Sequence, residues 1–100
     1  SFTLKIINKL NKIKNYQIGV HDHSFNFIDK KIFPKNIKIY TSLSNAIKGS
    51  EILIITTPWE IYSKIDNIKN KIIIDCWGTL KNKINISKNN KYILIGKAIN

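Results

Sequence analysis

Three short runs of mostly β-branched residues constrain the fold more than any other feature of this sequence. They are EILIITT (51–57), KIIID (71–75) and KYILI (91–95). A strand covered on both faces has such a continuous apolar run, whereas a strand with one solvated face alternates apolar and polar residues. The three runs therefore predict buried strands of a parallel sheet.

The segments around these runs predict further strands in alternation with helices. The predicted helices are 2–14, 41–50 and 58–69, and the predicted additional strands are 16–21 and 37–40, the latter at an edge. Alternating strands and helices favour an α/β fold with a three-layer, Rossmann-like, mainly parallel sheet. Because the chain opens with a helix that no strand precedes, we expect it to lack the first, central strand of that sheet.

The junction TTPWE (56–60) has the residues of a helix start. Thr57 can cap a helix, Pro58 fits its first turn, and Glu60 stands three residues after the cap, where a capping box places its acidic member. The spacing predicts a helix that begins at Pro58 with Thr57 as its cap. In the short helix at 41–50, Thr41 or Ser42 is expected to be the cap.

Length and residue usage indicate one domain over residues 1–100, long enough for a modest core. The chain begins at Ser1 and contains no Met, which we interpret as an N-terminally truncated fragment. No apolar run reaches the length that a bilayer requires, so no membrane partner is expected. Cys76 is the only cysteine, which favours a cytoplasmic protein without disulfides.

The net charge of +11 raises the question of nucleic-acid binding. All 17 basic residues are Lys and none is Arg, and they are scattered over every segment. Base and phosphate recognition relies heavily on the planar fork of Arg. The charge therefore indicates a solvated surface, and no specific nucleic-acid partner is expected.

Four segments in order give the chain a resemblance to a known family. They are VHD (20–22), EILIITTPWEIYSKID (51–66), IIIDCWGTL (72–80) and YILIGKA (92–98). Together with the opening SFTLKII, they resemble the C-terminal, UDP-binding domain of the UDP-glucose/GDP-mannose dehydrogenase family. The resemblance covers nearly all 100 residues.

The resemblance implies a parent enzyme of polysaccharide biosynthesis that oxidises the C6 hydroxyl of a nucleotide sugar with NAD, through a catalytic cysteine. The family carries that cysteine and the NAD site elsewhere in a longer chain, and Cys76 stands where the family has Gly. The resemblance therefore implies a UDP-sugar-binding portion, inactive alone, with no catalytic residue and no cofactor of its own. Its partners would be a nucleotide sugar and the remainder of its own chain, with homo-oligomerisation left open.

Two departures from the family pattern concern the nucleotide site. The family's upstream Phe-Lys stretch does not precede the first helix. In place of Asp-Gly-Arg-Asn the chain has Asp75-Cys76-Trp77-Gly78, so that Trp77 replaces an Arg that reaches the nucleotide sugar. A tryptophan can stack on a base, but it cannot make the charged contact.

The carboxyl ends of the predicted strands supply the candidate substrate-binding residues, because ligands of open α/β sheets bind at that edge. They are Asp22, Thr56, Asp75 and Trp77. For Asp22 the alternative is bonding to nearby backbone, and for Thr56 it is a satisfied strand end.

Other polar or aromatic residues favour structural roles. His21 and His23 share a strand face, but no further ligand has the spacing of a zinc site, so no metal is expected. Trp59 and Tyr62 are spaced for packing on a helix. The function that competes with the nucleotide-sugar domain is a non-enzymatic Rossmann-like module that has lost its nucleotide site, and Trp77 separates the two.

Overall fold

The computed structural model describes residues 2–13, 15–22, 30–83 and 88–95. The chain divides into two compact units, Ser1–Lys48 and Gly49–Asn100, which are described separately below. Every strand pair among the described residues is parallel, and the α/β content is that of a Rossmann-like fragment, as the sequence predicted. None of the helices in this part of the chain combines the length and apolar character that crossing a membrane requires.

The first unit contains two helices, one turn of 3-10 helix and two short strands. They are α1 (Phe2–Asn11), β1 (Gly19–His21), the 3-10 helix (Lys30–Ile32), β2 (Lys38–Tyr40) and α2 (Leu43–Lys48). β1 and β2 form a two-stranded sheet, and α2 packs against both strands. The backbone N–H of Asn45 donates to Ser42 Oγ over 3.2 Å, so Ser42 is the cap of α2, one of the two residues predicted for this role.

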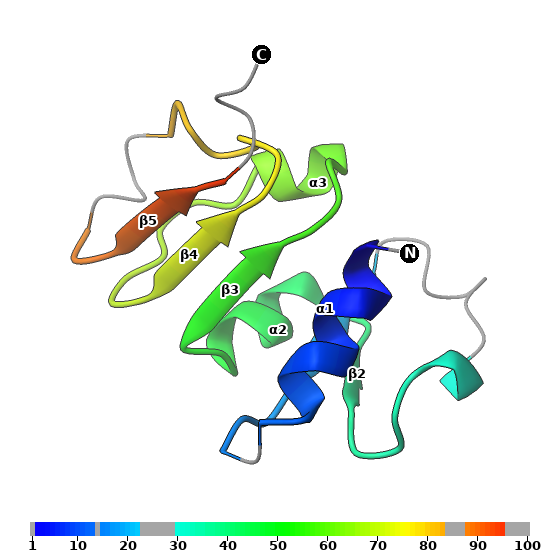
Figure 1. Cartoon of the computed structure of the whole chain (residues 1–100). Helices are drawn as coiled ribbons and strands as arrows, with labels where there is room; N and C mark the ends of the chain where they lie inside the picture. The colour runs from blue at the N-terminus through cyan, green and yellow to red at the C-terminus, as the bar shows by residue number, and fades with distance from the viewer. Residues whose placement is uncertain (1, 14, 23–29, 84–87, 96–100) are drawn as a thin grey trace. The chain divides into compact units, whose positions relative to one another are not determined.

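The second unit is built on a three-stranded sheet of order β3-β4-β5 (Figure 1). The elements are β3 (Ile52–Ile55), α3 (Glu60–Ser63), β4 (Ile72–Asp75) and β5 (Lys91–Leu94). Because successive side chains point to opposite faces, the register Ile55↔Asp75 and Ile73↔Tyr92 places these four side chains on one face. Ile55, Ile73 and Asp75 are buried there, and the central strand β4 supplies the two that are fully buried.

The strands fall into two sheets, which corrects the expectation of one continuous sheet. β1 pairs with β2, and β3 pairs with β4, whereas no pairing joins β1 to β3 among the described residues. β1 has only three residues, far fewer than the predicted 16–21. A pairing this short offers few hydrogen bonds to offset the cost of ordering the backbone.

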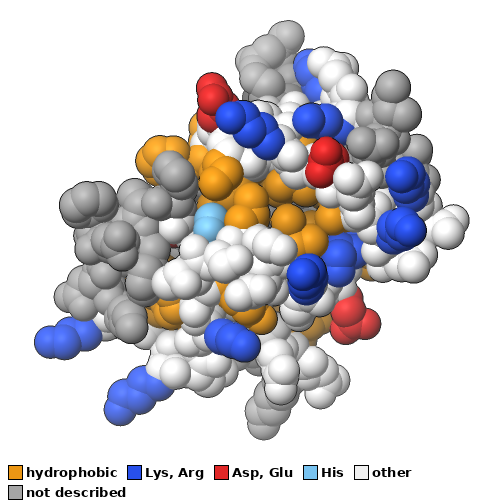
Figure 2. All heavy atoms as spheres, turned by 180° about the vertical axis from the view of Figure 1, so that it is seen from behind, with side chains coloured by type: hydrophobic (Ala, Val, Ile, Leu, Met, Phe, Trp, Pro, Cys, Tyr) orange, Lys and Arg blue, Asp and Glu red, His pale blue; other side chains and the backbone are white. Residues whose placement is uncertain are grey.

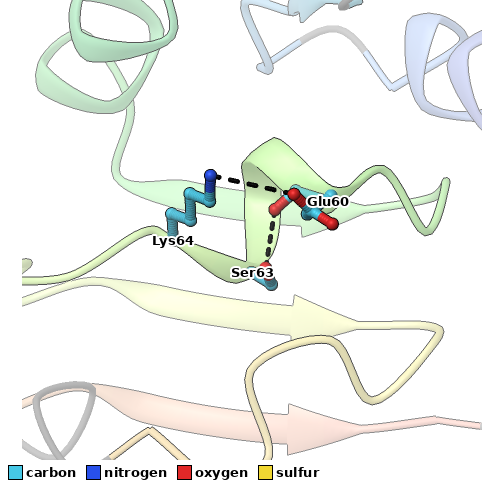
Figure 3. A network of polar contacts seen from close by, with 3 residues as sticks. All are labelled: Glu60, Ser63 and Lys64. Carbon is cyan, nitrogen blue, oxygen red and sulfur yellow. Dashed lines mark hydrogen bonds and ion pairs between the residues drawn. The ribbon is translucent and has the colours of Figure 1, made fainter.

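The helix after β3 begins later than predicted, and its predicted cap is wrong. α3 starts at Glu60, its N-cap is Trp59, and no side chain caps it. The Glu60 carboxylate instead lies 3.8 Å from Lys64 Nζ, while Ser63 Oγ donates to the Glu60 carbonyl oxygen over 2.6 Å (Figure 3). Trp59 is extended and Pro58 is outside the helix, so the first helical turn begins two residues later than a Thr57 cap requires.

Candidate functional site

Asp75 is the centre of a hydrogen-bonded arrangement at the carboxyl end of β4. It is the last residue of the strand and is fully buried. Its Oδ1 accepts the backbone N–H of Trp77 over 3.1 Å. Its Oδ2 accepts the backbone N–H of Leu80 over 2.8 Å and the hydroxyl of Tyr92 over 2.6 Å. A carboxylate with this many donors satisfies the rule that buried charge must be paired or hydrogen-bonded.

The loop after β4 wraps around that carboxylate because its sequence suits a tight turn. An Asp that bonds the N–H two residues later forms an Asx turn, which Asp75 does with Trp77. Gly78 then takes φ 72°, a left-handed conformation that side chains with a Cβ disfavour. Leu80 closes the loop as a fully buried apolar anchor. The loop from Asp75 to Leu80 is thereby fixed from both ends.

Burial and hydrogen bonding act on the Asp75 carboxyl in opposite directions. Burial by itself raises its pKa, because it disfavours the charged form. The N–H of Leu80, the Tyr92 hydroxyl, and the N–H groups of Trp77 and Thr79 together lower the pKa below its ordinary value. The pKa of Tyr92 is raised, first by burial and then by the hydrogen bond to Asp75 and its negative charge. Asp75 is therefore ionised and Tyr92 neutral at physiological pH.

Trp77 joins this loop to the end of β3. Its indole N–H donates to the carbonyl oxygen of Thr56 over 2.8 Å. Thr56 directly follows β3, and Trp77 stands two residues beyond β4. The Trp77 side chain is still 44% exposed, so the ring is anchored by its edge and open to solvent elsewhere. We call Thr56, Asp75, Trp77 and Tyr92 the strand-end cluster.

Three of the four residues predicted from the sequence thus lie together in the second unit. Asp22 directly follows β1 and belongs to the first unit, where it is half-buried. Thr56 takes part through its backbone carbonyl oxygen, and Trp77 through its indole and its own backbone N–H. Asp75 is enclosed by protein donors and turned away from solvent.

Sequence reasoning missed Tyr92, which bonds Asp75 from the neighbouring strand. The contact depends on the parallel register of β4 and β5, which places Ile73 opposite Tyr92. Tyr92 opens the YILIGKA segment that carried part of the family resemblance, and this was the available signal.

The residues present do not build a site for NAD. A dinucleotide cradle needs a Gly-x-Gly-x-x-Gly loop between a strand and a helix. The four glycines of the chain are far apart in sequence, and the β3–α3 junction carries Pro58 and Trp59 in place of glycine. Gly78 is the only glycine with positive φ among the described residues, and it serves the turn around Asp75.

In the described part of the chain, the surroundings of the other candidate residues indicate structural roles. Burial, and then the charge of Asp75, raise the pKa of the Cys76 thiol, which disfavours the nucleophilic thiolate. Tyr62 is buried, as its predicted packing role requires, whereas Trp59 is 38% exposed. No group of three or more potential metal ligands gathers among the described residues, and His23 lies outside them.

Comparison with known proteins bears on this geometry. No curated protein and no solved structure matches the chain. Residues 1–82 match the family model described as the UDP-glucose/GDP-mannose dehydrogenase family, UDP binding domain. The match spans the elements from α1 to β4 and the whole loop from Asp75 to Leu80. The chain therefore belongs to the UDP-glucose/GDP-mannose dehydrogenase family, through its UDP binding domain.

Proposed function

We propose that this chain binds the nucleotide sugar for an NAD-dependent nucleotide-sugar 6-dehydrogenase of polysaccharide biosynthesis. The catalytic cysteine and the NAD site belong to other parts of the parent enzyme, which is then the first partner of this chain. The single observation that carries the proposal is the family match over residues 1–82, which includes Thr56, Asp75 and Trp77 of the strand-end cluster. The lone cysteine favours a cytoplasmic setting.

The proposed binding edge is the carboxyl end of the parallel strands, where open α/β sheets bind ligands. Thr56 and Trp77 line it, and Asp75 acts through the loop that it holds in place, since its carboxylate is fully buried. Asp22 directly follows β1 in the first unit, and its role in binding the nucleotide sugar stays a prediction.

Binding by this chain alone should be weak. One charged contact expected from the family is lost, because Trp77 stands where the family has Arg. A hydrogen bond to a charged group contributes about 1.5–3 kcal/mol. Since about 1.4 kcal/mol is a factor of ten, this loss weakens binding by roughly one to two orders of magnitude.

Titration of UDP-glucose into the 15N-labelled chain tests the proposal. We expect chemical-shift changes at Thr56, at the loop from Asp75 to Leu80 and at Tyr92, with glucose as the non-binding control. Shift changes confined to the opposite edge of the sheet, near Asn70 and Asn89, would show that the proposed binding edge is wrong.

A second function, a Rossmann-like module that has lost its nucleotide site, is favoured by the replacement of Arg by Trp77. Under that alternative, UDP-glucose causes no shift changes although the spectrum shows a folded chain. A third reading, nucleic-acid binding, has less support, because none of the 17 basic residues is Arg and acidic side chains lie beside Lys side chains in Figure 2.

A further inference from the structure

We propose that Trp77 is a pre-oriented stacking platform for the flat ring of the nucleotide, so that this chain recognises its ligand through the nucleobase more than through the phosphates. The inference rests on the proposed function, and it specifies which part of the ligand is bound and by which kind of interaction. It starts from the one position where the family's charged residue is replaced by an aromatic one.

The anchoring of Trp77 fixes the plane of its ring. Its indole N–H, the only polar group of the side chain, donates to the Thr56 carbonyl oxygen. Its backbone N–H donates to the buried carboxylate of Asp75, which also holds Leu80. The ring is thus tied to the ends of both β3 and β4. A side chain ordered before binding loses little conformational entropy when a ligand arrives.

The exposure of Trp77 leaves ring surface for a ligand. The side chain is 44% exposed although its N–H is already bonded. An exposed indole with its donor satisfied offers a ligand only its apolar face, which suits stacking on a base. It offers nothing to a phosphate, which an Arg at this position would bind as a bidentate, charged pair.

Stacking on the base and charged binding of the phosphates differ in their response to salt. Contacts between exposed charges weaken as ionic strength rises, because counter-ions screen them. Stacking of neutral rings carries no such dependence. Uridine should therefore bind nearly as well as UDP-glucose, and both affinities should change little with salt.

The experiment uses the 100-residue chain carrying Trp59→Phe, so that Trp77 is the only tryptophan and its fluorescence reports directly on the ring. Uridine, UDP-glucose and glucose 1-phosphate are titrated at low and high salt, with NMR as a second readout. We expect quenching of Trp77 by uridine and UDP-glucose with affinities within about threefold of each other, and no quenching by glucose 1-phosphate.

Substitutions at position 77 separate the two modes. Trp77→Ala should weaken uridine binding by about 10-fold to 100-fold, and Trp77→Phe by much less, as for other stacked bases. Trp77→Arg should bind UDP-glucose in a salt-dependent way and should lose its affinity for uridine. Trp59→Ala, in a chain that retains Trp77, is the matched control, because Trp59 is also an exposed tryptophan and should not change binding.

The outcomes distinguish this inference from the function beneath it. Binding of UDP-glucose at the strand ends that survives Trp77→Ala overturns the platform and leaves the proposed function standing. Equal competition by glucose 1-phosphate and UDP-glucose also overturns the platform, because phosphate would then be the recognised group. Absence of binding by all three ligands to the folded chain overturns both.

Discussion

The two units of this chain are ordered by different kinds of interaction. In the second unit, a buried carboxylate on the central strand gathers donors from its own loop and from β5, and Trp77 ties that loop to β3. In the first unit, two strands of three residues each lie side by side under α2. The family match covers the first unit and residues 49–82 of the second, so one family pattern includes units that are held together by different kinds of contact.

Close backbone and ring contact characterises the first unit. A Cβ added at Gly19 would lie 2.5 Å from Tyr40 Cε2, so the aromatic ring occupies the space that a side chain would need. Lys38 Nζ lies 4.8 Å from the centroid of the same ring. The first unit therefore depends on a residue without a side chain, Gly19, where the Tyr40 ring lies close to the backbone, whereas the second unit depends on a polar network.

The largest expected effect comes from removing the Asp75 carboxylate. Asp75→Ala leaves buried backbone donors and the Tyr92 hydroxyl without their acceptor. We expect a loss of about 3–5 kcal/mol in the free energy of unfolding of the second unit, because each buried donor left without an acceptor costs about 1–3 kcal/mol. Hydrogen exchange measured residue by residue should show this loss in β3, β4 and β5.

Asp66→Ala is the matched control, because Asp66 is an exposed carboxylate of the same unit. It should change the stability by less than about 0.5 kcal/mol. Equal loss of protection in both units after Asp75→Ala would contradict the division of the chain into two units, since it would mean that the chain unfolds as one cooperative body.

Removing the Tyr92 hydroxyl should have the next largest effect. Tyr92→Phe deletes a hydrogen bond to a charged group, which contributes about 1.5–3 kcal/mol. The substitution also removes one of the contacts that lower the pKa of Asp75. Chemical denaturation at neutral pH measures the first effect. Unchanged stability would mean that water replaces the hydroxyl as a donor to the Asp75 carboxylate.

The pH dependence of stability tests the same hydrogen bond independently. Because the pKa of Asp75 is lower in the folded chain than its ordinary value of 3.8, its contribution is present above that value and is lost as pH falls toward the folded pKa. In Tyr92→Phe the acid transition should move to higher pH. An acid transition identical in both proteins would show that Tyr92 does not tune the carboxyl.

Sequence patterns found the elements whose signals are local. Continuous runs of β-branched residues predicted β3, β4 and β5. The serine directly before Leu43 was one of the two residues predicted to cap α2. The predicted start of α3 was wrong, because Thr57-Pro58-Trp59-Glu60 fits an extended turn as well as a capping box. Residue types and their spacing do not determine which of these two conformations the flanking chain favours.

The candidate site was predictable only in part, for a related reason. Strand ends are marked in the sequence, and three of the four chosen residues lie together in one unit. The Tyr92 donor was not predictable, because Tyr92 is 17 residues from Asp75 and meets it only through the register of β4 and β5. The bond between the Trp77 indole and the Thr56 carbonyl oxygen depends likewise on how β3 and β4 pair.

Gly19→Ala should destabilise the first unit and leave the stability of the second unchanged. The new Cβ meets the Tyr40 ring at 2.5 Å, so the ring or the strand must move. Overpacking of this kind costs about 1–2 kcal/mol where a ring can swing aside. Loss of exchange protection should appear in β1 and β2. In a Tyr40→Ala background the same substitution should cost much less, and an equal cost in both backgrounds would exclude the ring as its cause.

The smallest expected effect compares two residues that both resemble helix caps in the sequence. Ser42 Oγ accepts the N–H of Asn45, whereas α3 begins three residues after Thr57 and has no side-chain cap. Ser42→Ala should therefore cost about 1 kcal/mol, the usual value of a lost N-cap. Thr57→Ala should cost less than about 0.5 kcal/mol, as for surface positions without a specific role. Denaturant midpoints of the two variants measure the difference. A cost for Thr57→Ala equal to that of Ser42→Ala would restore Thr57 as a cap and would mean that α3 begins at Pro58.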